Sequence, residues 1–146
     1  MRILAEAIFH ITFKSEWAAR RGGQYVPASY PGEGFIHFST SSQLLSTSNR
    51  LFKGRNDLLV LEVEPEGLES DLVFENLEGG SELFPHLYSA LPIENVVRKF
   101  CLKPDEKGIL VWIRKGRNLH LASLTRARLT LIGRRTNPCA IDWDVG

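Results

Sequence analysis

The chain has 146 residues, 43% of them hydrophobic and 24% charged, and its formal net charge is +1. This length and composition predict one globular domain with a sizeable core. No apolar run approaches the roughly 18 residues of a membrane span, and the first residues lack the apolar stretch of a signal peptide. Two cysteines without CxxC spacing argue against a metal cage built on cysteine. We therefore expect a cytoplasmic protein with no membrane partner.

The charge is unevenly distributed. Residues 1–112 carry 11 Lys and Arg against 15 Asp and Glu, a net charge of −4, whereas residues 113–146 carry 7 against 2, a net charge of +5. A basic segment after an acidic body is either a solvated extension or a contact surface for nucleic acid. We predict a domain over residues 1–113 and a basic C-terminal extension over residues 114–146, through which nucleic acid would be a partner.

The first elements are a strand and a short helix. Residues 7–13 alternate between apolar and polar side chains, which predicts a strand. Ser15 has the character of an N-cap, so a short helix should follow and end at Gly22-Gly23. An extended piece is expected over residues 24–29 and a loop over residues 30–34.

A strand and a longer helix come next. Residues 35–39 are rich in aromatic and β-branched side chains, which predicts a strand. Thr40 and Gln43 have the spacing of a capping box, so we predict a helix that runs to about Phe52 and stops at Gly54.

The middle of the chain predicts further strands. Residues 58–63 form a continuous apolar run typical of a buried strand, and residues 72–75 predict another. Glu78-Gly79-Gly80 is expected to turn. Residues 83–88 are apolar but contain Pro85, which predicts an edge strand or an irregular segment.

The last elements are short. A helical turn is expected within residues 92–97, followed by strands over residues 97–102 and 109–113, with a weaker candidate over residues 129–132. Many short strands with two early helices predict an α+β fold.

Three histidines, His10, His37 and His86, occupy strand-like segments. Because side chains alternate along a strand, His10 should share a face with Thr12, and His37 with Ser39. Histidine titrates near neutral pH and serves as ligand, acid or base, so a polar pocket is predicted where these segments meet. For each residue the alternative is a half-buried structural histidine that is hydrogen-bonded to the backbone.

Glu82 is the acidic candidate for this pocket. It follows Gly79-Gly80-Ser81 and lies four residues before His86, so both side chains share a face in a strand or a helix. His10, His37, His86 and Glu82 are also ligand types for zinc, but their spacing matches no close-spaced zinc signature. A nucleophile elbow around Ser39, a P-loop and a GxGxxG motif are all missing.

These motifs resemble a small bacterial family described as domain of unknown function 952. The resemblance runs from about Ala7 to Ile113 and leaves the segment from Arg114 outside. Its residues are Ile8-Phe9-His10-Ile11-Thr12, Trp17, Tyr25, Gly34 to Thr40, Asn49 to Leu58, Gly80 to Tyr88 and Leu91-Pro92.

The resemblance implies an ADP-ribosyltransferase-like fold, in which two small facing β-sheets form a cleft, here with two short helices. In that group a first-strand histidine, matched by His10, holds a ribose hydroxyl of NAD. A Ser-Thr-Ser sequence, matched by Ser39-Thr40-Ser41, lines the nicotinamide pocket, and a glutamate, matched by Glu82, holds the other ribose. The sequence departs from the pattern because the usual tyrosine of the second motif is absent, and because His37 and His86 are additional.

The function implied is the binding of NAD or a related nucleotide, with transfer of ADP-ribose or a related group. Glu82 and His10 would be catalytic, and the nucleotide would be bound by His10, His37, Ser39, Thr40 and His86, with no metal cofactor. A carboxylate near the ribose would stabilise the oxocarbenium-like transition state of nicotinamide release. One alternative is a non-catalytic module that binds nucleotides or RNA ends, in which histidines hold phosphate. A weaker alternative is a His/Glu metal site.

Overall fold

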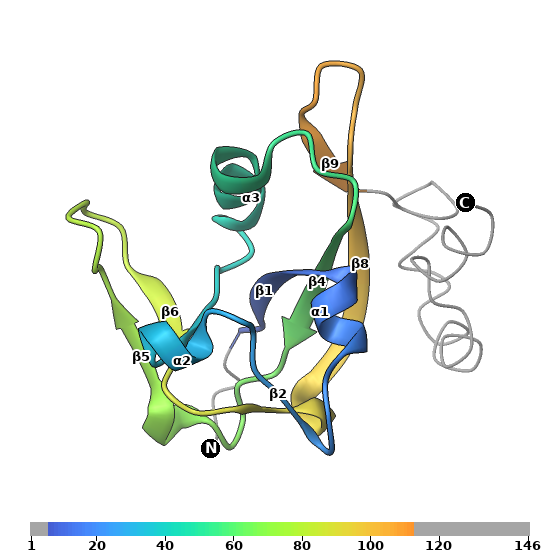
Figure 1. The fold of residues 1–146 in the computed structure, drawn as a ribbon. Helices are drawn as coiled ribbons and strands as arrows, with labels where there is room; N and C mark the ends of the chain where they lie inside the picture. Colours follow the sequence, from blue (N-terminus) through green and yellow to red (C-terminus); the bar gives the residue numbers. More distant parts are fainter. Residues whose placement is uncertain (1–5, 113–146) are drawn as a thin grey trace, which may run out of the picture.

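The computed structural model of the protein describes residues 6–112, which fold into three antiparallel sheets and three α-helices (Figure 1). The prediction of an α+β fold is confirmed, with one helix more than the two expected. The helices are α1 (Lys14–Ala18), α2 (Tyr30–Glu33) and α3 (Leu44–Phe52). The strands are β1 (Ile8–Phe13), β2 (Gln24–Tyr25), β3 (Ile36–His37), β4 (Leu58–Val63), β5 (Leu72–Glu75), β6 (Phe84–Leu87), β7 (Leu91–Pro92), β8 (Val96–Pro104) and β9 (Leu110–Trp112), with 3-10 turns at Glu69–Asp71 and Ile93–Asn95. The strand predicted over residues 129–132 and the predicted extension over residues 114–146 lie outside the described residues.

The largest sheet has the order β1-β4-β8-β9, and β4 lies inside it. Its continuous apolar sequence is explained by burial on both faces. Leu59, Leu61 and Val63 belong to one core cluster, and Leu58 and Val60 belong to a second. β1 is one of the two outer strands and follows the same alternation, with Ile8 in the first core and Phe9, Ile11 and Phe13 packed against the second.

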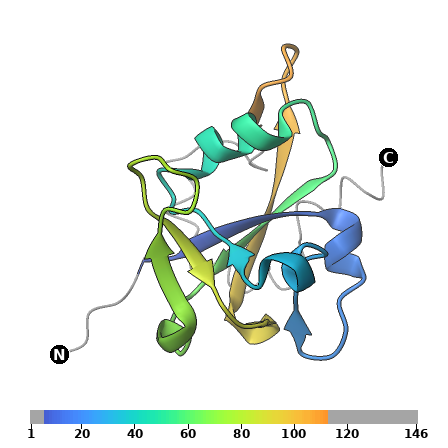
Figure 2. The same cartoon turned by 60° about the vertical axis from the view of Figure 1, so that its left-hand side comes forward.

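The two faces of this sheet are covered differently. The first is packed against the three-stranded sheet β3-β6-β5 and the β2–β7 pair, which contribute Ile36, Leu87, Tyr25 and Leu91 to the first core. The second face is covered by α3, whose Leu44 is fully buried in the second core. In Figure 2, β1 crosses the middle of the molecule between α3 and the small sheets.

Two early predictions were wrong in detail. Ser15 does not cap α1, which begins at Lys14 and has no side-chain cap. The Lys14 amide instead donates to the carbonyl of Asp57, 2.9 Å away, so a distant segment satisfies the helix start. The loop expected over residues 30–34 contains the helix α2, which has Pro31 in its first turn, where a proline is tolerated.

Only one of the two hydrogen bonds of the predicted capping box before α3 is present. The Thr40 amide donates to Oε1 of Gln43 at 2.9 Å, as a capping box requires, but the intervening residues form a turn and the helix begins at Leu44. Gln43 also donates from Nε2 to the carbonyl of Leu83 at 2.8 Å, which ties this turn to the segment before β6. Gly54 follows the helix with φ 86°, a left-handed conformation that suits glycine.

The prediction for Pro85 was wrong because β6 is the central strand of its sheet. The Pro85 carbonyl accepts a hydrogen bond from the Phe38 amide at 2.9 Å. β3 pairs with β6 over only two residues and ends at His37, opposite His86. The nitrogen of Pro85, which has no hydrogen to donate, lies beyond this two-residue ladder. No helix within residues 6–112 is long and apolar enough to cross a membrane.

Candidate functional site

A pocket of about 380 Å³ lies along the outer edge of β1, between α3 and the three-stranded sheet. This volume falls within the range of small-molecule sites. Much of the lining is apolar, including Phe9, Ile11, Phe13, Phe38 and Phe84. The polar lining consists of His10, His37, His86, Thr12, Ser29, Ser39, Thr47, Asn76, Glu16, Glu33, Glu78 and Arg50.

The open edge of β1 supplies backbone groups to this pocket. Phe9 exchanges two hydrogen bonds with Ser39, at 2.8 and 2.7 Å, on the side of β1 that faces away from β4. Backbone groups of alternate residues point to the same side of a strand. The amide and carbonyl of Ile11 therefore face the same edge, and Ile11 lines the pocket.

His10 is held in a buried network on β1. Its Nδ1 lies 2.7 Å from the carbonyl oxygen of His37, and its Nε2 lies 3.3 Å from the hydroxyl of Tyr25. The Tyr25 hydroxyl is also 2.6 Å from Oγ1 of Thr12. His10 shares its face with Thr12, as predicted, and both are buried.

The hydrogen on the His10 ring can be assigned. A carbonyl oxygen only accepts, so Nδ1 of His10 donates to His37. Burial lowers the pKa of His10 to about 4, so the ring is neutral at pH 7 and Nε2 is an acceptor. The Tyr25 hydroxyl can then donate to Nε2, and Oε1 of Glu16 is a further acceptor for the hydroxyls of Thr12 and Tyr25, at 3.4 and 3.5 Å. Both ring nitrogens of His10 are thus engaged, which favours the alternative of a structural histidine at this position.

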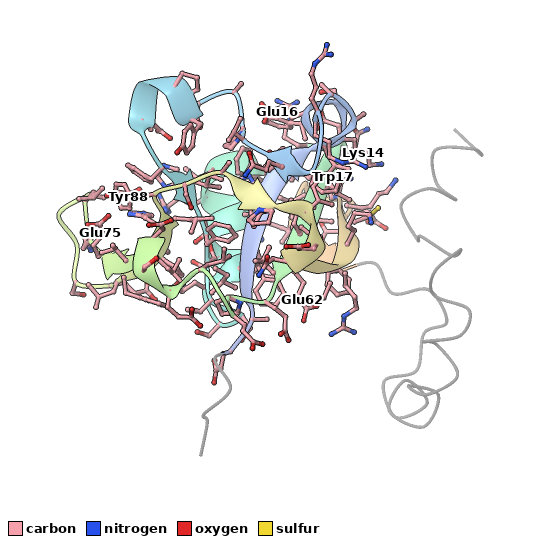
Figure 3. All side chains as sticks on the ribbon, turned by 90° about the horizontal axis from the view of Figure 1, so that it is seen from below. Lys14, Glu16, Trp17, Glu62, Glu75 and Tyr88 are labelled. Carbon is pink, nitrogen blue, oxygen red and sulfur yellow. The ribbon has the colours of Figure 1, made fainter. Side chains whose placement is uncertain are left out.

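His86 is placed differently. Its Nδ1 donates to Oε1 of Glu75 at 2.9 Å, and the hydroxyl of Tyr88 donates to the same oxygen. The other ring nitrogen, Nε2, has no hydrogen-bond partner within residues 6–112, yet no buried polar side-chain atom there is left without one. Nε2 is therefore not completely enclosed by the surrounding protein, and His86 lines the pocket. Figure 3 shows Glu75 and Tyr88 side by side at one end of the molecule.

His37 stands beside His86, with the two ring centroids 5.0 Å apart. Its Nε2 donates to Oε1 of Glu33 at 3.1 Å, and about half of its side chain is exposed. The ring of Phe35 contacts both histidines, at centroid distances of 4.7 Å to His37 and 4.4 Å to His86. Each histidine thus has its own carboxylate and one shared aromatic neighbour.

The pocket contains four of the six predicted site residues: His10, His37, Ser39 and His86. The prediction that Glu82 converges on the same cleft was wrong. Glu82 is exposed in the loop between β5 and β6, it is not part of the pocket lining, and its carbonyl accepts a hydrogen bond from Asn76 at 2.6 Å. Thr40 also lies outside the lining, with its amide bonded to Gln43.

The carboxylate that reaches His86 is Glu75, which sequence reasoning missed. Glu75 is opposite Phe84 in the register, so it lies diagonally across the β5–β6 pair from His86 and on the same face. Eight residues separate β5 from β6, so the sequence does not fix how the two strands pair. Glu82 was predicted as the partner of His86 because it is nearer to His86 in sequence. Within residues 6–112 no group of three or more His, Cys, Asp or Glu side chains is arranged to hold a metal ion, so the structure gives no support to the metal alternative.

These observations describe an α+β domain with a histidine-lined pocket at the edge of its main sheet. The family model described as "Protein of unknown function (DUF952)" matches residues 11–99, and the chain belongs to this family. The comparison with curated proteins gave no match.

Solved structures with the same architecture come from Caulobacter crescentus. The crystal structure of protein CC0527 is 36% identical, with a TM-score of 0.64, over 72% of this chain and 93% of that one. The solution NMR structure of CC0527 is 37% identical, with a TM-score of 0.62, over 70% of this chain and 90% of that one.

Proposed function

We propose that the pocket binds NAD or a related nucleotide, in a domain of the ADP-ribosyltransferase-like kind that the sequence motifs imply. The observation that carries this proposal is the placement of His86. His86 lines the pocket while Glu75 engages Nδ1, which leaves Nε2 as the nitrogen for a ligand. A base oriented by a carboxylate is the usual arrangement for proton transfer in group-transfer enzymes.

The apolar wall and the β1 edge suit an aromatic amide such as nicotinamide. Phe9 and Phe13 present rings on the same side of β1 as Ile11. The amide and carbonyl of Ile11 offer one donor and one acceptor, which is the complement of a carboxamide. Such a pairing would fix the ring without requiring a charged side chain.

The charge of the pocket favours a ligand with hydroxyl groups and a positive centre. Glu16, Glu33 and Glu78 line it, while among the described residues Arg50 is the one Lys or Arg side chain in its lining. Arg50 is itself paired with Glu78 at 3.7 Å. Carboxylates accept hydrogen bonds from ribose hydroxyls and stabilise the positive charge of a nicotinamide ring.

The chemistry proposed is transfer of the ribosyl group to an acceptor hydroxyl. The bond from ribose C1′ to the nicotinamide nitrogen breaks, and its electron pair neutralises the ring. The acceptor oxygen bonds to C1′, and His86 Nε2 takes its proton. Glu75 supports this step, because its carboxylate holds the His86 tautomer and stabilises the imidazolium that forms. This role differs from the ribose contact that the resemblance implied for Glu82. His10 would contact a ribose only by giving up its 3.3 Å bond to Tyr25.

The rival proposal is a non-catalytic module in which His37 and His86 hold a phosphate of a nucleotide or an RNA end. The structure favours it less. His37 already faces Glu33, and His86 faces Glu75, at 3.1 and 2.9 Å. A phosphate at either ring would therefore approach a carboxylate of like charge.

Thermal melting with NAD, ADP-ribose, AMP and nicotinamide tests the proposal. A ligand of the native state at 100 times its dissociation constant stabilises the fold by about 2.7 kcal/mol. We expect NAD to raise Tm, and His86→Gln to reduce this shift while the melting of the free protein stays cooperative. Glu82→Gln is the matched control and should respond like the wild type. The proposal fails if none of these compounds changes Tm at millimolar concentration.

A further inference from the structure

A second polar feature lies on the first face of the main sheet, around Trp17 of α1. The guanidinium carbon of Arg20 lies 4.1 Å from the centroid of the Trp17 ring, and its NH1 donates to the Trp17 carbonyl at 2.6 Å. The ammonium of Lys99, on β8, lies 6.0 Å from the same centroid. In Figure 3, Trp17 is at the end of the molecule away from Glu75 and Tyr88, so this cluster is separate from His86.

The position of Lys99 follows from the strand register. Lys99 is opposite Leu61 of β4, and Leu61 is fully buried in the same core as Trp17. The Lys99 side chain therefore starts on the core face and runs out past the indole. Its stem covers apolar surface while the charged end reaches the boundary, as is usual for long basic side chains.

Unlike the neighbouring Arg98, Arg20 and Lys99 are not paired with a carboxylate within residues 6–112. Arg98, next in sequence but on the opposite face of β8, is paired with Glu62, with Nε to Oε1 at 3.0 Å and NH2 to Oε2 at 3.2 Å. Within residues 6–112, neither Arg20 nor Lys99 makes an ion pair with a carboxylate. Burial, and then the charge of Arg20, lower the pKa of Lys99. Two positive charges thus lie beside the same indole ring, and Lys99 is partly out of water.

We propose that Arg20 and Lys99 form a binding site for a phosphate group, in addition to the pocket. Arg20 is fixed by its ring and carbonyl contacts, so its planar donors can engage two phosphate oxygens with little loss of side-chain freedom. Lys99 adds a point charge that is strengthened by partial desolvation. Trp17 is only 5% exposed, so it supports Arg20 and offers no face on which a base could stack. The site therefore recognises phosphate and not a nucleobase.

The test titrates the full chain with inorganic pyrophosphate and measures binding by calorimetry and by the NMR signal of the Trp17 indole. Lys99→Gln should weaken pyrophosphate binding about tenfold, since a charge-assisted hydrogen bond is lost. Arg98→Gln is the matched control, because it removes an equal charge from the adjacent, already paired position. His86→Gln should leave this binding unchanged, which separates the site from the pocket.

A second arm identifies the source of the phosphate. A 5′-phosphorylated RNA oligonucleotide is the second probe. If it binds more tightly than pyrophosphate, with an affinity that falls steeply with salt and depends on Lys99, the phosphate belongs to a nucleic-acid polymer. Tighter binding of pyrophosphate indicates a small phosphate compound. The proposal is overturned if neither probe binds at millimolar concentration, or if Arg98→Gln weakens binding as much as Lys99→Gln does.

Discussion

Nδ1 of His86 lies 2.9 Å from Oε1 of Glu75, and this contact joins a buried ring to a carboxylate on the neighbouring strand. The pair lies diagonally across β5 and β6, so it exists only when these strands adopt the observed register. In the neutral ring this contact places the hydrogen on Nδ1, which leaves the lone pair on Nε2. The proposed chemistry depends on this relationship more than on any other.

The first prediction concerns Tyr88. Its hydrogen bond, and then that of His86, lower the pKa of Glu75. Tyr88→Phe should therefore raise the pKa of Glu75, as measured by NMR titration of the side-chain carboxyl carbon. Because the folded pKa is depressed, this contact stabilises the protein above the unfolded pKa of Glu75 and is lost as pH falls through the folded value. An unchanged titration of Glu75 would show that the Tyr88 contact does not persist in solution.

The second prediction concerns the buried ring of His10. Burial lowers its pKa from 6.5 to about 4, so between these values the unfolded chain binds a proton that the folded one does not. The free energy of unfolding should fall by about 3 kcal/mol as pH drops from 6.5 toward 4. Urea unfolding of His10→Asn should show a shallower dependence over this window. Equal slopes in the two proteins would contradict the assigned neutral state.

The third prediction concerns the hydroxyl of Tyr25. Tyr25→Phe removes the partner of His10 Nε2 and the shorter of the two hydrogen bonds of the Thr12 hydroxyl, so the free energy of unfolding should fall by about 1–3 kcal/mol. Tyr30→Phe is the matched control, because Tyr30 packs against the same core through its ring. Its cost should stay within about 0.5 kcal/mol. Chemical denaturation of both variants measures the difference, and equal costs would refute the network.

The fourth prediction separates two glutamates. Glu75→Gln should sharply reduce any nicotinamide release, because an amide cannot stabilise an imidazolium as a carboxylate does. Glu82→Gln should retain wild-type activity, since Glu82 is exposed outside the pocket lining. Nicotinamide release from NAD measures both. A loss confined to Glu82→Gln would restore the role that the sequence motifs implied for Glu82.

Local patterns predicted much of the fold. The bounds of β4 and β5 were predicted without error, because a continuous apolar run and a short β-rich segment between turns are local signals. The cap at Ser15 failed because the Asp57 carbonyl, far away in sequence, satisfies the first amide of α1. The placement of Pro85 failed because a strand's neighbours are set by tertiary pairing.

The site was predictable only in part, for the same reason. The alternation rule placed His10 and Thr12 on one face of a strand, as observed. It could not show that a carbonyl and a tyrosine from other segments occupy both nitrogens of that ring. The partner of His86 also depended on strand register across a loop, so Glu82 was chosen in place of Glu75.

The most direct test of the proposed function is a long-range ¹H–¹⁵N spectrum of the histidine rings during titration with NAD. We predict saturable shifts of His86 Nε2 and of His37, with His86 Nδ1 remaining protonated. Glu75→Gln should abolish this tautomer preference, whereas Glu82→Gln should not. If NAD and ADP-ribose at millimolar concentration leave the His86 and His37 signals in place, the pocket does not bind these nucleotides and the proposed function is wrong.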